Sequence, residues 1–132
     1  MATTIAQLTL TSSDLLSDTL ELTTLASIVA ANTNGLNRKK VLQTAVHNDA
    51  LVLYTADDFA APASIYIKNT ADYHASNNIV YVYDGTTSGT PVILKLHGGA
   101  FAFMPTNADK TLKAYSSTSG TVLESMVIGT DQ

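Results

Sequence analysis

Short runs of alternating apolar and polar residues follow one another along the second half of the chain, separated by polar turns. The clearest runs are residues 64–69, 78–83, 92–96, 100–105, 112–115 and 121–128. Alternation with a period of two sends successive side chains to opposite faces of a strand. Strands at this spacing, with turn signals such as Asp84-Gly85 between them, are typical of antiparallel sandwiches and barrels. The pattern predicts an all-β fold, namely an antiparallel β-sandwich of the jelly-roll type or a relative of it.

The same alternation predicts which side chains form the core. We expect these residues to face inward: Ile65, Ile67, Val80, Val82, Val92, Leu94 and Leu96. Their neighbours would face outward: Tyr66, Lys68, Tyr81, Tyr83, Lys95 and His97. Phe101 and Phe103 are expected to be the main anchors of the core, because aromatic rings bury the largest areas.

Residues 1–34 differ from the rest of the chain in their pattern of apolar residues and threonines. Residues 6–11 and 18–23 alternate as strands do, with Thr at the outward positions. A helix over residues 22–32 competes with this interpretation, because apolar residues also recur there at helical spacing. Thr is a poor helix former, so a strand or an extended arm is favoured. We expect an arm with the first strands over residues 1–34 and the sandwich over residues 35–132, within a single domain overall.

Turn residues divide the middle of the chain. Asn34-Gly35 is a strong turn signal, and strands are expected to follow over residues 38–47 and 51–54. Residues 57–62 indicate a loop, residues 86–91 an exposed hairpin connection, and residues 116–120 an exposed turn.

Few residues of the chain are charged. The charged fraction is 14% and there is no cysteine, which excludes disulfides and thiol chemistry. A surface so poor in charge is a weak solubiliser for a free monomer. It suits a protein that is covered by copies of itself or by a larger assembly, or alternatively a stable extracellular β domain.

The charge balance argues against nucleic acid as a partner. The formal net charge is −4, whereas a protein that binds the phosphate backbone normally presents a basic face. The one basic cluster is Arg38-Lys39-Lys40. Its simplest interpretation is a solvated turn, and the alternative is a contact with an acidic partner surface.

Neither a membrane span nor an export signal is expected. The longest apolar stretch, residues 25–31, is far shorter than the roughly 18 residues that a transmembrane helix requires. The first residues lack the basic region and the hydrophobic core of a signal peptide. We expect synthesis and assembly in a cytoplasm.

No catalytic arrangement stands out. The run His97-Gly98-Gly99 is superficially like the oxyanion motif of lipases, but the G-x-S-x-G nucleophile elbow is missing. A glycine-rich turn is the better interpretation. The sequence does not show whether the carboxylates of Asp72 and Glu124 lie close together, so a carboxylate pair of the glycosidase type stays open. The chain is expected not to be an enzyme.

Metal ligands and cofactor sites are not expected either. The histidines His47, His74 and His97 lie on separate segments, so a site would have to be assembled by the fold. Asp57-Asp58, with Asp49 nearby, could bind Ca²⁺, but the EF-hand spacing is absent. Solvated side chains are the favoured interpretation of both groups.

Tyrosines are the remaining candidates for a binding surface. They can stack on sugars or pack against a partner protein, or they can pair across strands within the fold. Together with the basic cluster they give this set of possible partner contacts: Arg38, Lys39, Lys40, Tyr66, Tyr81 and Tyr83. Tyr73 belongs to the same group of tyrosines.

Five segments, in their shared order, carry a resemblance. They are residues 13–18 (SDLLSD), 35–39 (GLNRK), 65–70 (IYIKNT), 98–105 (GGAFAFMP) and 123–128 (LESMVI). In this order the chain resembles small β-rich virion proteins of tailed bacteriophages, particularly marine and cyanobacterial ones. That family often has an acidic residue after the glycine pair, where this chain has Ala100.

The resemblance implies a structural role in the virion. The expected function is a capsid decoration, or cement, protein on the exterior of the icosahedral head. Its implied partners are the major capsid protein and copies of itself, for which a closed ring such as a trimer would fit, with no nucleic acid, membrane or cofactor. The alternative is an accessory tail or fibre protein that recognises a host surface or a carbohydrate, using exposed tyrosines and the loop of residues 86–90.

Overall fold

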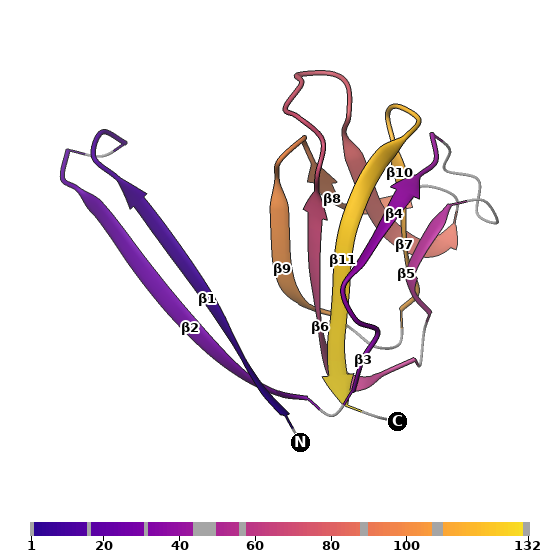
Figure 1. Ribbon diagram of the computed structural model, residues 1–132, viewed down its shortest axis with the longest axis horizontal. Coiled ribbons are helices and arrows are strands. Elements are labelled where there is room, and N and C mark those ends of the chain that lie inside the picture. Colours follow the sequence, from indigo (N-terminus) through magenta and orange to yellow (C-terminus); the bar gives the residue numbers. More distant parts are fainter. Residues whose placement is uncertain are drawn as a thin grey trace. The chain divides into compact units, whose positions relative to one another are not determined.

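The computed structural model describes residues 2–15, 17–30, 32–43, 50–55, 58–87, 90–106 and 110–130 (Figure 1). All of its regular structure in these ranges is β-strand. The chain divides into two compact units, Met1–Ala31 and Asn32–Gln132. Asn32 and Thr33, which the sequence assigned to the arm, pair with the last strand and so belong to the second unit.

The first unit, called the arm below, is one long β-hairpin. β1 (Ala2–Ser12) pairs antiparallel with β2 (Leu20–Ala30), in unbroken register from Ala2 opposite Ala30 to Ser12 opposite Leu20. The strand interpretation of this segment is confirmed, and the helix that competed with it over residues 22–32 is not formed. A two-stranded hairpin has no interior, so the side chains of the arm lie on two open faces.

The second unit is a sandwich of two antiparallel sheets. Its strands are β3 (Asn32–Thr33), β4 (Asn37–Val41), β5 (Leu51–Tyr54), β6 (Ala60–Asn69), β7 (Val80–Thr87), β8 (Thr90–Leu96), β9 (Phe101–Thr106), β10 (Leu112–Ser116) and β11 (Thr121–Thr130). The four-stranded sheet has the order β5-β10-β7-β8. The five-stranded sheet has the order β3-β11-β6-β9, and β4 also pairs with β11.

This strand order is a jelly roll. From β4 to β11 the chain passes back and forth between the sheets, and β7–β8 is the one pair of successive strands that are also neighbours within a sheet. With the two-residue β3 set aside, β4-β11-β6-β9 and β5-β10-β7-β8 are two four-stranded layers. Joined by these long connections, they form the double Greek-key arrangement. The fold class expected from the alternating pattern is confirmed.

The core lies between the two sheets. From the five-stranded sheet it contains Ile65, Ile67, Leu123 and Val127, and from the other sheet Val80, Val82 and Ala114, all at most 1% exposed. Each is flanked by a residue of the opposite face, as the period of two requires. The inward assignment of Ile65, Ile67, Val80, Val82 and Leu96 is confirmed.

The prediction that Phe101 and Phe103 anchor the core is wrong. Their side chains are 60% and 38% exposed, and Ala102 and Met104 pack on the core instead. β9 is an edge strand, and its register beside β6 sets Phe103 opposite the outward Tyr66. On β9 the inward and outward positions are therefore exchanged relative to the prediction from side-chain size.

Two further expectations about phase are corrected. Val92 is 43% exposed, because the register of β7 and β8 shifts between Val82 and Tyr83 and turns it away from the core. Tyr83, expected on the surface, is fully buried.

Several expected boundaries can also be compared with the structure. The turn before β11 and the strand of residues 51–54 are confirmed. The loop expected up to residue 62 ends earlier, because β6 begins at Ala60. The basic triplet lies within β4 and not in a turn. The strand expected to continue to residue 47 ends at Val41, and residues 44–47 lie outside the described residues. The connection expected over residues 86–91 is shorter, because β7 ends at Thr87 and β8 begins at Thr90, with residues 88 and 89 outside the described residues.

Buried Asn69 ties the two sheets together at one end of the sandwich. Its side-chain amide donates to the carbonyl oxygens of Asn78 (2.6 Å), two residues before β7, and of Leu96 (2.9 Å), at the end of β8. Its side-chain oxygen accepts from the backbone N–H of Ala71 at 3.1 Å. Gly98 lies in the adjoining turn, where a Cβ would come within 2.0 Å of the Asp72 carbonyl oxygen. The glycine-rich turn expected from the sequence is confirmed, and the close approach at Gly98 shows that packing requires glycine there.

We predict that Asn69→Ala lowers the free energy of unfolding by about 3 kcal/mol, because it leaves buried carbonyl and N–H groups without partners. Chemical denaturation followed by tyrosine fluorescence measures the change. Asn77→Ala is the matched control, since Asn77 is exposed on the neighbouring loop and should shift stability by less than about 0.5 kcal/mol. Equal effects of the two variants would contradict the proposed bridge.

Candidate interaction surfaces

The outer face of the five-stranded sheet gathers charged and aromatic side chains from four strands. Cross-strand register aligns Arg38 of β4, Glu124 of β11, Lys68 of β6 and Phe101 of β9 in one row. The next row holds Met126, Tyr66 and Phe103. Residues directly opposite on one face of a sheet lie within side-chain contact distance of each other. The rows therefore form one continuous surface.

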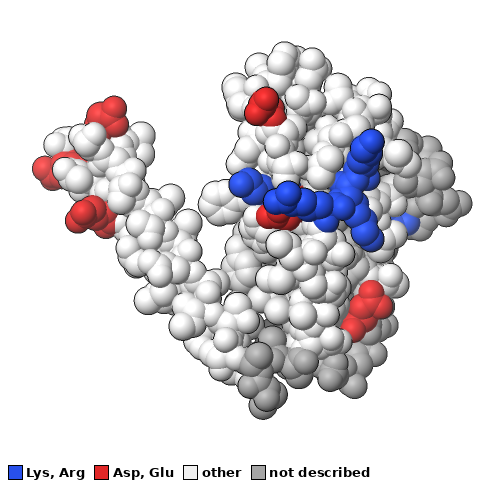
Figure 2. Space-filling view, in the orientation of Figure 1, with Lys and Arg blue, Asp and Glu red and all other residues white. Residues whose placement is uncertain are grey.

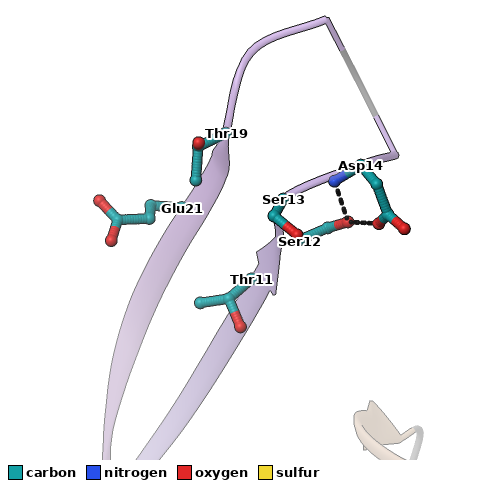
Figure 3. Close-up of a pocket in the computed structure, with 6 residues that line it drawn as sticks. All are labelled: Thr11, Ser12, Ser13, Asp14, Thr19 and Glu21. Atoms are coloured by element: carbon teal, nitrogen blue, oxygen red, sulfur yellow. Dashed lines mark hydrogen bonds between the residues drawn. The ribbon is translucent and has the colours of Figure 1, made fainter.

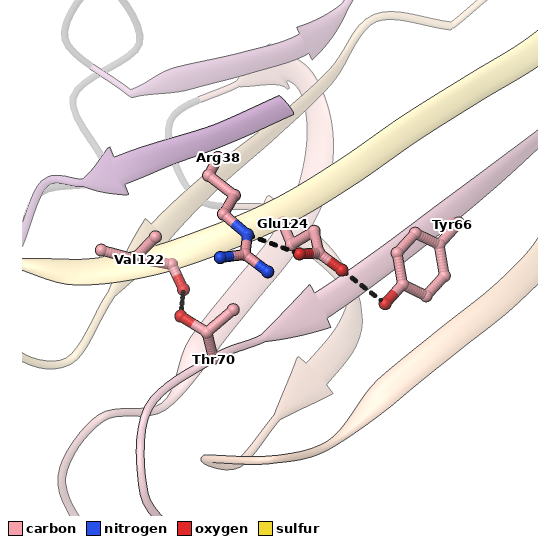
Figure 4. A network of polar contacts seen from close by, with 5 residues as sticks. All are labelled: Arg38, Tyr66, Thr70, Val122 and Glu124. Atoms are coloured by element: carbon pink, nitrogen blue, oxygen red, sulfur yellow. Dashed lines mark hydrogen bonds and ion pairs between the residues drawn. The ribbon is translucent and has the colours of Figure 1, made fainter. Parts of the chain in front are cut away.

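Glu124 is the centre of the polar part of this surface (Figure 4). Arg38 Nε donates to its Oε2 at 2.6 Å, and the Tyr66 hydroxyl donates to its Oε1 at 2.9 Å. The Glu124 side chain is 11% exposed and that of Arg38 is 70% exposed. Beside them, the Thr70 hydroxyl donates to the Val122 carbonyl at 2.7 Å and joins the end of β6 to β11.

These contacts set the protonation of both acidic groups. The hydrogen bond from Arg38, followed by that from Tyr66, lowers the pKa of Glu124. The pKa of Tyr66 is raised, first by desolvation and then by its hydrogen bond to Glu124. Glu124 is therefore a paired carboxylate that fixes the positions of two partners, and it is not poised as a general acid.

Basic and apolar side chains surround this network. Lys40 shares the outer face with Arg38, because it lies two residues along β4 opposite Val122. Figure 2 shows Lys and Arg side chains gathered over β4, β11 and β6. Phe101 and Phe103 border the basic side chains on the edge strand. We call the following residues the aromatic-basic face: Arg38, Lys40, Tyr66, Lys68, Phe101, Phe103 and Met126.

The predicted partner contacts divide among different parts of the fold. Arg38, Lys40 and Tyr66 come together on this face. Lys39 is exposed at the edge of the sheet, opposite Leu123. Tyr81 lies on the other sheet, where its ring stacks on Tyr115 with centroids 5.0 Å apart.

Tyr83 is fully buried, so it offers no surface for a partner. Its ring meets that of Tyr115 edge-on, with the centroids 5.8 Å apart. The alternative interpretation of these tyrosines as cross-strand aromatic pairs fits Tyr81 and Tyr115, which are directly opposite in register.

Another exposed aromatic side chain, away from the aromatic-basic face, lies in the loop between β6 and β7. Tyr73 is 72% exposed, and its ring lies beside that of His97 with the centroids 5.8 Å apart. Asp72 and His74, the neighbours of Tyr73, are exposed as well. The cluster presents an aromatic ring, a carboxylate and two imidazoles to solvent at the end of the sandwich.

The described residues hold no group of three His, Cys, Asp or Glu side chains that could bind a metal ion. His47, Asp49 and Asp57 of the expected candidates lie outside those residues. Asp58 accepts from the backbone N–H of Thr55 at 2.8 Å, as a turn residue does.

A shallow hollow at the tip of the arm is lined by Thr11, Ser12, Ser13, Asp14, Thr19 and Glu21 (Figure 3). The Ser12 hydroxyl donates to Asp14 Oδ1 at 3.0 Å and accepts from the backbone N–H of Leu15 at 3.0 Å. The carboxylates of Asp14 and Glu21 point away from each other (Figure 3). They therefore do not form a chelating pair.

No protein-family model matches the chain, and neither the curated proteins nor the solved structures include a match to it. Among the described residues there is no helix that could span a membrane.

The aromatic half of the face could not be identified by side-chain size alone. Phe101 and Phe103 are larger than the alanines between them, so they were placed inside. One signal pointed the other way, because Pro105 in the same run is typical of an edge strand, where one face can stay open. Lys68 was correctly expected to face outward, but nothing local placed it beside Glu124, which lies 56 residues away in sequence.

We predict that Glu124→Gln destabilises the protein at neutral pH and that the deficit shrinks as the pH falls below 4.5, the ordinary pKa of the group. A carboxyl group whose pKa is lowered by folding stabilises the fold at pH values above its pKa in the unfolded chain. This stabilisation is lost as the pH falls through the lower pKa of the folded state. Urea unfolding at pH 7 and pH 3 measures this. In an Arg38→Gln background the effect of Glu124→Gln should be smaller; a pH-independent deficit would contradict the assignment.

Proposed function

We propose that the chain is a structural protein of a bacteriophage virion, a decoration protein that covers the exterior of the icosahedral head in many copies. The observation that carries the proposal is the arm. It is a hairpin of two 11-residue strands whose apolar side chains are exposed, among them Ile5 (68%), Leu25 (64%) and Leu10 (45%).

Such a hairpin is marginally stable by itself in water, because it lacks a third layer to bury its apolar side chains. Exposed apolar surfaces of this extent usually mark sites of protein association. An arm that needs a partner to cover it fits a protein whose working state is an assembly.

The remainder of the chain is compatible with this role. Jelly rolls occur in viral capsid proteins and in lectins, although a fold by itself does not define a function. The low charge suits surfaces that become covered. Many equivalent weak contacts on a symmetric particle would combine into stable attachment.

We expect the protein in purified virions of the phage that encodes it, in an amount comparable to the major capsid protein. Quantitative mass spectrometry of the particles measures the ratio, and heads from a deletion mutant should break at lower temperature than wild-type heads. Absence of the protein from virions would refute the proposal, and an amount typical of a tail component would shift it to the alternative.

That alternative, recognition of a carbohydrate by a tail or fibre component, has one specific observation in its favour. The exposed Tyr73 ring beside His97 and Asp72 combines an apolar ring face with polar groups, which suits stacking on a sugar. On this alternative, a glycan array should give a clear signal that Tyr73→Ala abolishes. Tyr81→Ala, on the outer face of the four-stranded sheet, should leave the signal unchanged. No glycan signal with the wild type would remove it.

A further inference from the structure

The two faces of the arm differ in composition. Directly opposite residues of an antiparallel pair share a face, so the register assigns ten described side chains to each side. We call one side the leucine face; it contains Thr4, Ala6, Leu8, Leu10, Ser12, Leu20, Leu22, Thr24, Ala26 and Ile28. It has no charged residue, whereas the opposite face holds Glu21, Gln7 and most of the threonines, with the apolar Ile5, Leu25 and Val29 set between these polar residues.

The leucine face is open to solvent along the arm. Leu10 and Leu22 are directly opposite each other and each is 45% exposed, while Leu8 is 39% exposed. These side chains lie side by side, so they form one apolar strip and not scattered exposed residues. A strip of this kind is suited to packing on another apolar surface.

The charges of the arm are all of one sign. Residues 1–31 contain Asp14, Asp18 and Glu21 and no Lys or Arg. Figure 2 shows the acidic side chains of the arm close to its tip, with the rest of its visible surface uncharged. The arm therefore offers an apolar strip that ends in a negative tip.

The aromatic-basic face has the complementary pattern. Phe101 and Phe103 are its exposed apolar part, and Arg38, Lys40 and Lys68 lie beside them. The carboxylate in this group, Glu124, is already paired with Arg38 and Tyr66. The face thus combines exposed aromatic rings with an excess of positive charge.

We propose that the arm of one copy packs its leucine face on the aromatic-basic face of a second copy, with the acidic tip beside Arg38, Lys40 and Lys68. Apolar contact supplies the attraction, and opposite charges fix the direction in which the arm lies. Donor and acceptor surfaces differ, so the contact is head-to-tail and generates rings or chains of copies. The inference rests on the proposed role of the arm in assembly but not on the identity of the particle.

The full-length chain tests this by sedimentation velocity over a range of protein concentrations. Leu10→Asp with Leu22→Asp should weaken self-association by about tenfold or more, equal to about 1.4 kcal/mol for each factor of ten. The matched control is Ile5→Asp with Leu25→Asp, which adds the same charges to the other face of the same strands and should weaken it much less. Equal loss in both pairs would overturn the assignment of the face.

A mixing experiment identifies the acceptor. Phe101→Asp with Phe103→Asp should also prevent self-association, while leaving the arm intact. An equimolar mixture of this variant with the Leu10→Asp, Leu22→Asp variant should form a one-to-one dimer, because one intact arm meets one intact face. Failure of the mixture to associate, with both variants folded by circular dichroism, would refute the contact.

Charge and location separate the remaining outcomes. Exchanging signs with Asp18→Lys at the tip and Lys40→Glu on the acceptor face together should restore association that either change alone weakens, and 1 M NaCl should weaken it in the wild type because salt screens the charges. A wild-type protein that is monomeric at every concentration refutes this inference and leaves virion decoration standing. A protein that self-associates in this way but is absent from virions refutes the decoration role alone.

Discussion

The sandwich depends on β11, the last strand of the described chain. β11 is a central strand of the five-stranded sheet, with β6 on one side and β4 and β3 on the other. Leu123 and Val127 face the core, and Glu124 holds the outer network together. In the described structure β4 pairs only with β11. Most strand neighbours are remote in sequence, so the jelly roll has to form by slow, non-local pairing, whereas the arm can form from local contacts.

The buried side-chain amide of Asn69 supplies hydrogen bonds that the apolar core cannot supply. Where strands end, carbonyl groups lose their ladder partners and need other donors if they are to be buried. Asn69 satisfies two of them, those of Leu96 at the end of β8 and of Asn78 just ahead of β7, with a single side chain. Farther along the sandwich, the hydroxyls of Tyr54 in β5 and Thr106 in β9 are hydrogen-bonded between the two sheets. The sheets are thus held by apolar packing in the middle and by polar contacts near their ends.

The sequence predicts the fold better than the surface for a physical reason. In two-faced strands such as β6 and β7, alternation alone identifies Ile65, Ile67, Val80 and Val82 as inward. Edge position and register shifts are tertiary properties, so the outward phase of Phe101 had no decisive local signal. The same holds for the aromatic-basic face, since β4, β11 and β6 become neighbours only when the jelly roll closes. Arg38 and Tyr66 were singled out as partner contacts, whereas their common partner Glu124 was considered only as one half of a possible carboxylate pair with Asp72.

The net charge of −4 conceals an uneven distribution. Three acidic residues lie on the arm without any cation, and the remaining eight share the second unit with all seven basic residues. Neither unit requires this separation for its own stability, because surface charges contribute little to folding. Nor does the arm gain stability by exposing Leu8, Leu10 and Leu22. Exposing the leucines is a cost to a solitary molecule, and under the proposed contact both features become favourable, because an apolar and positively charged surface covers the hairpin.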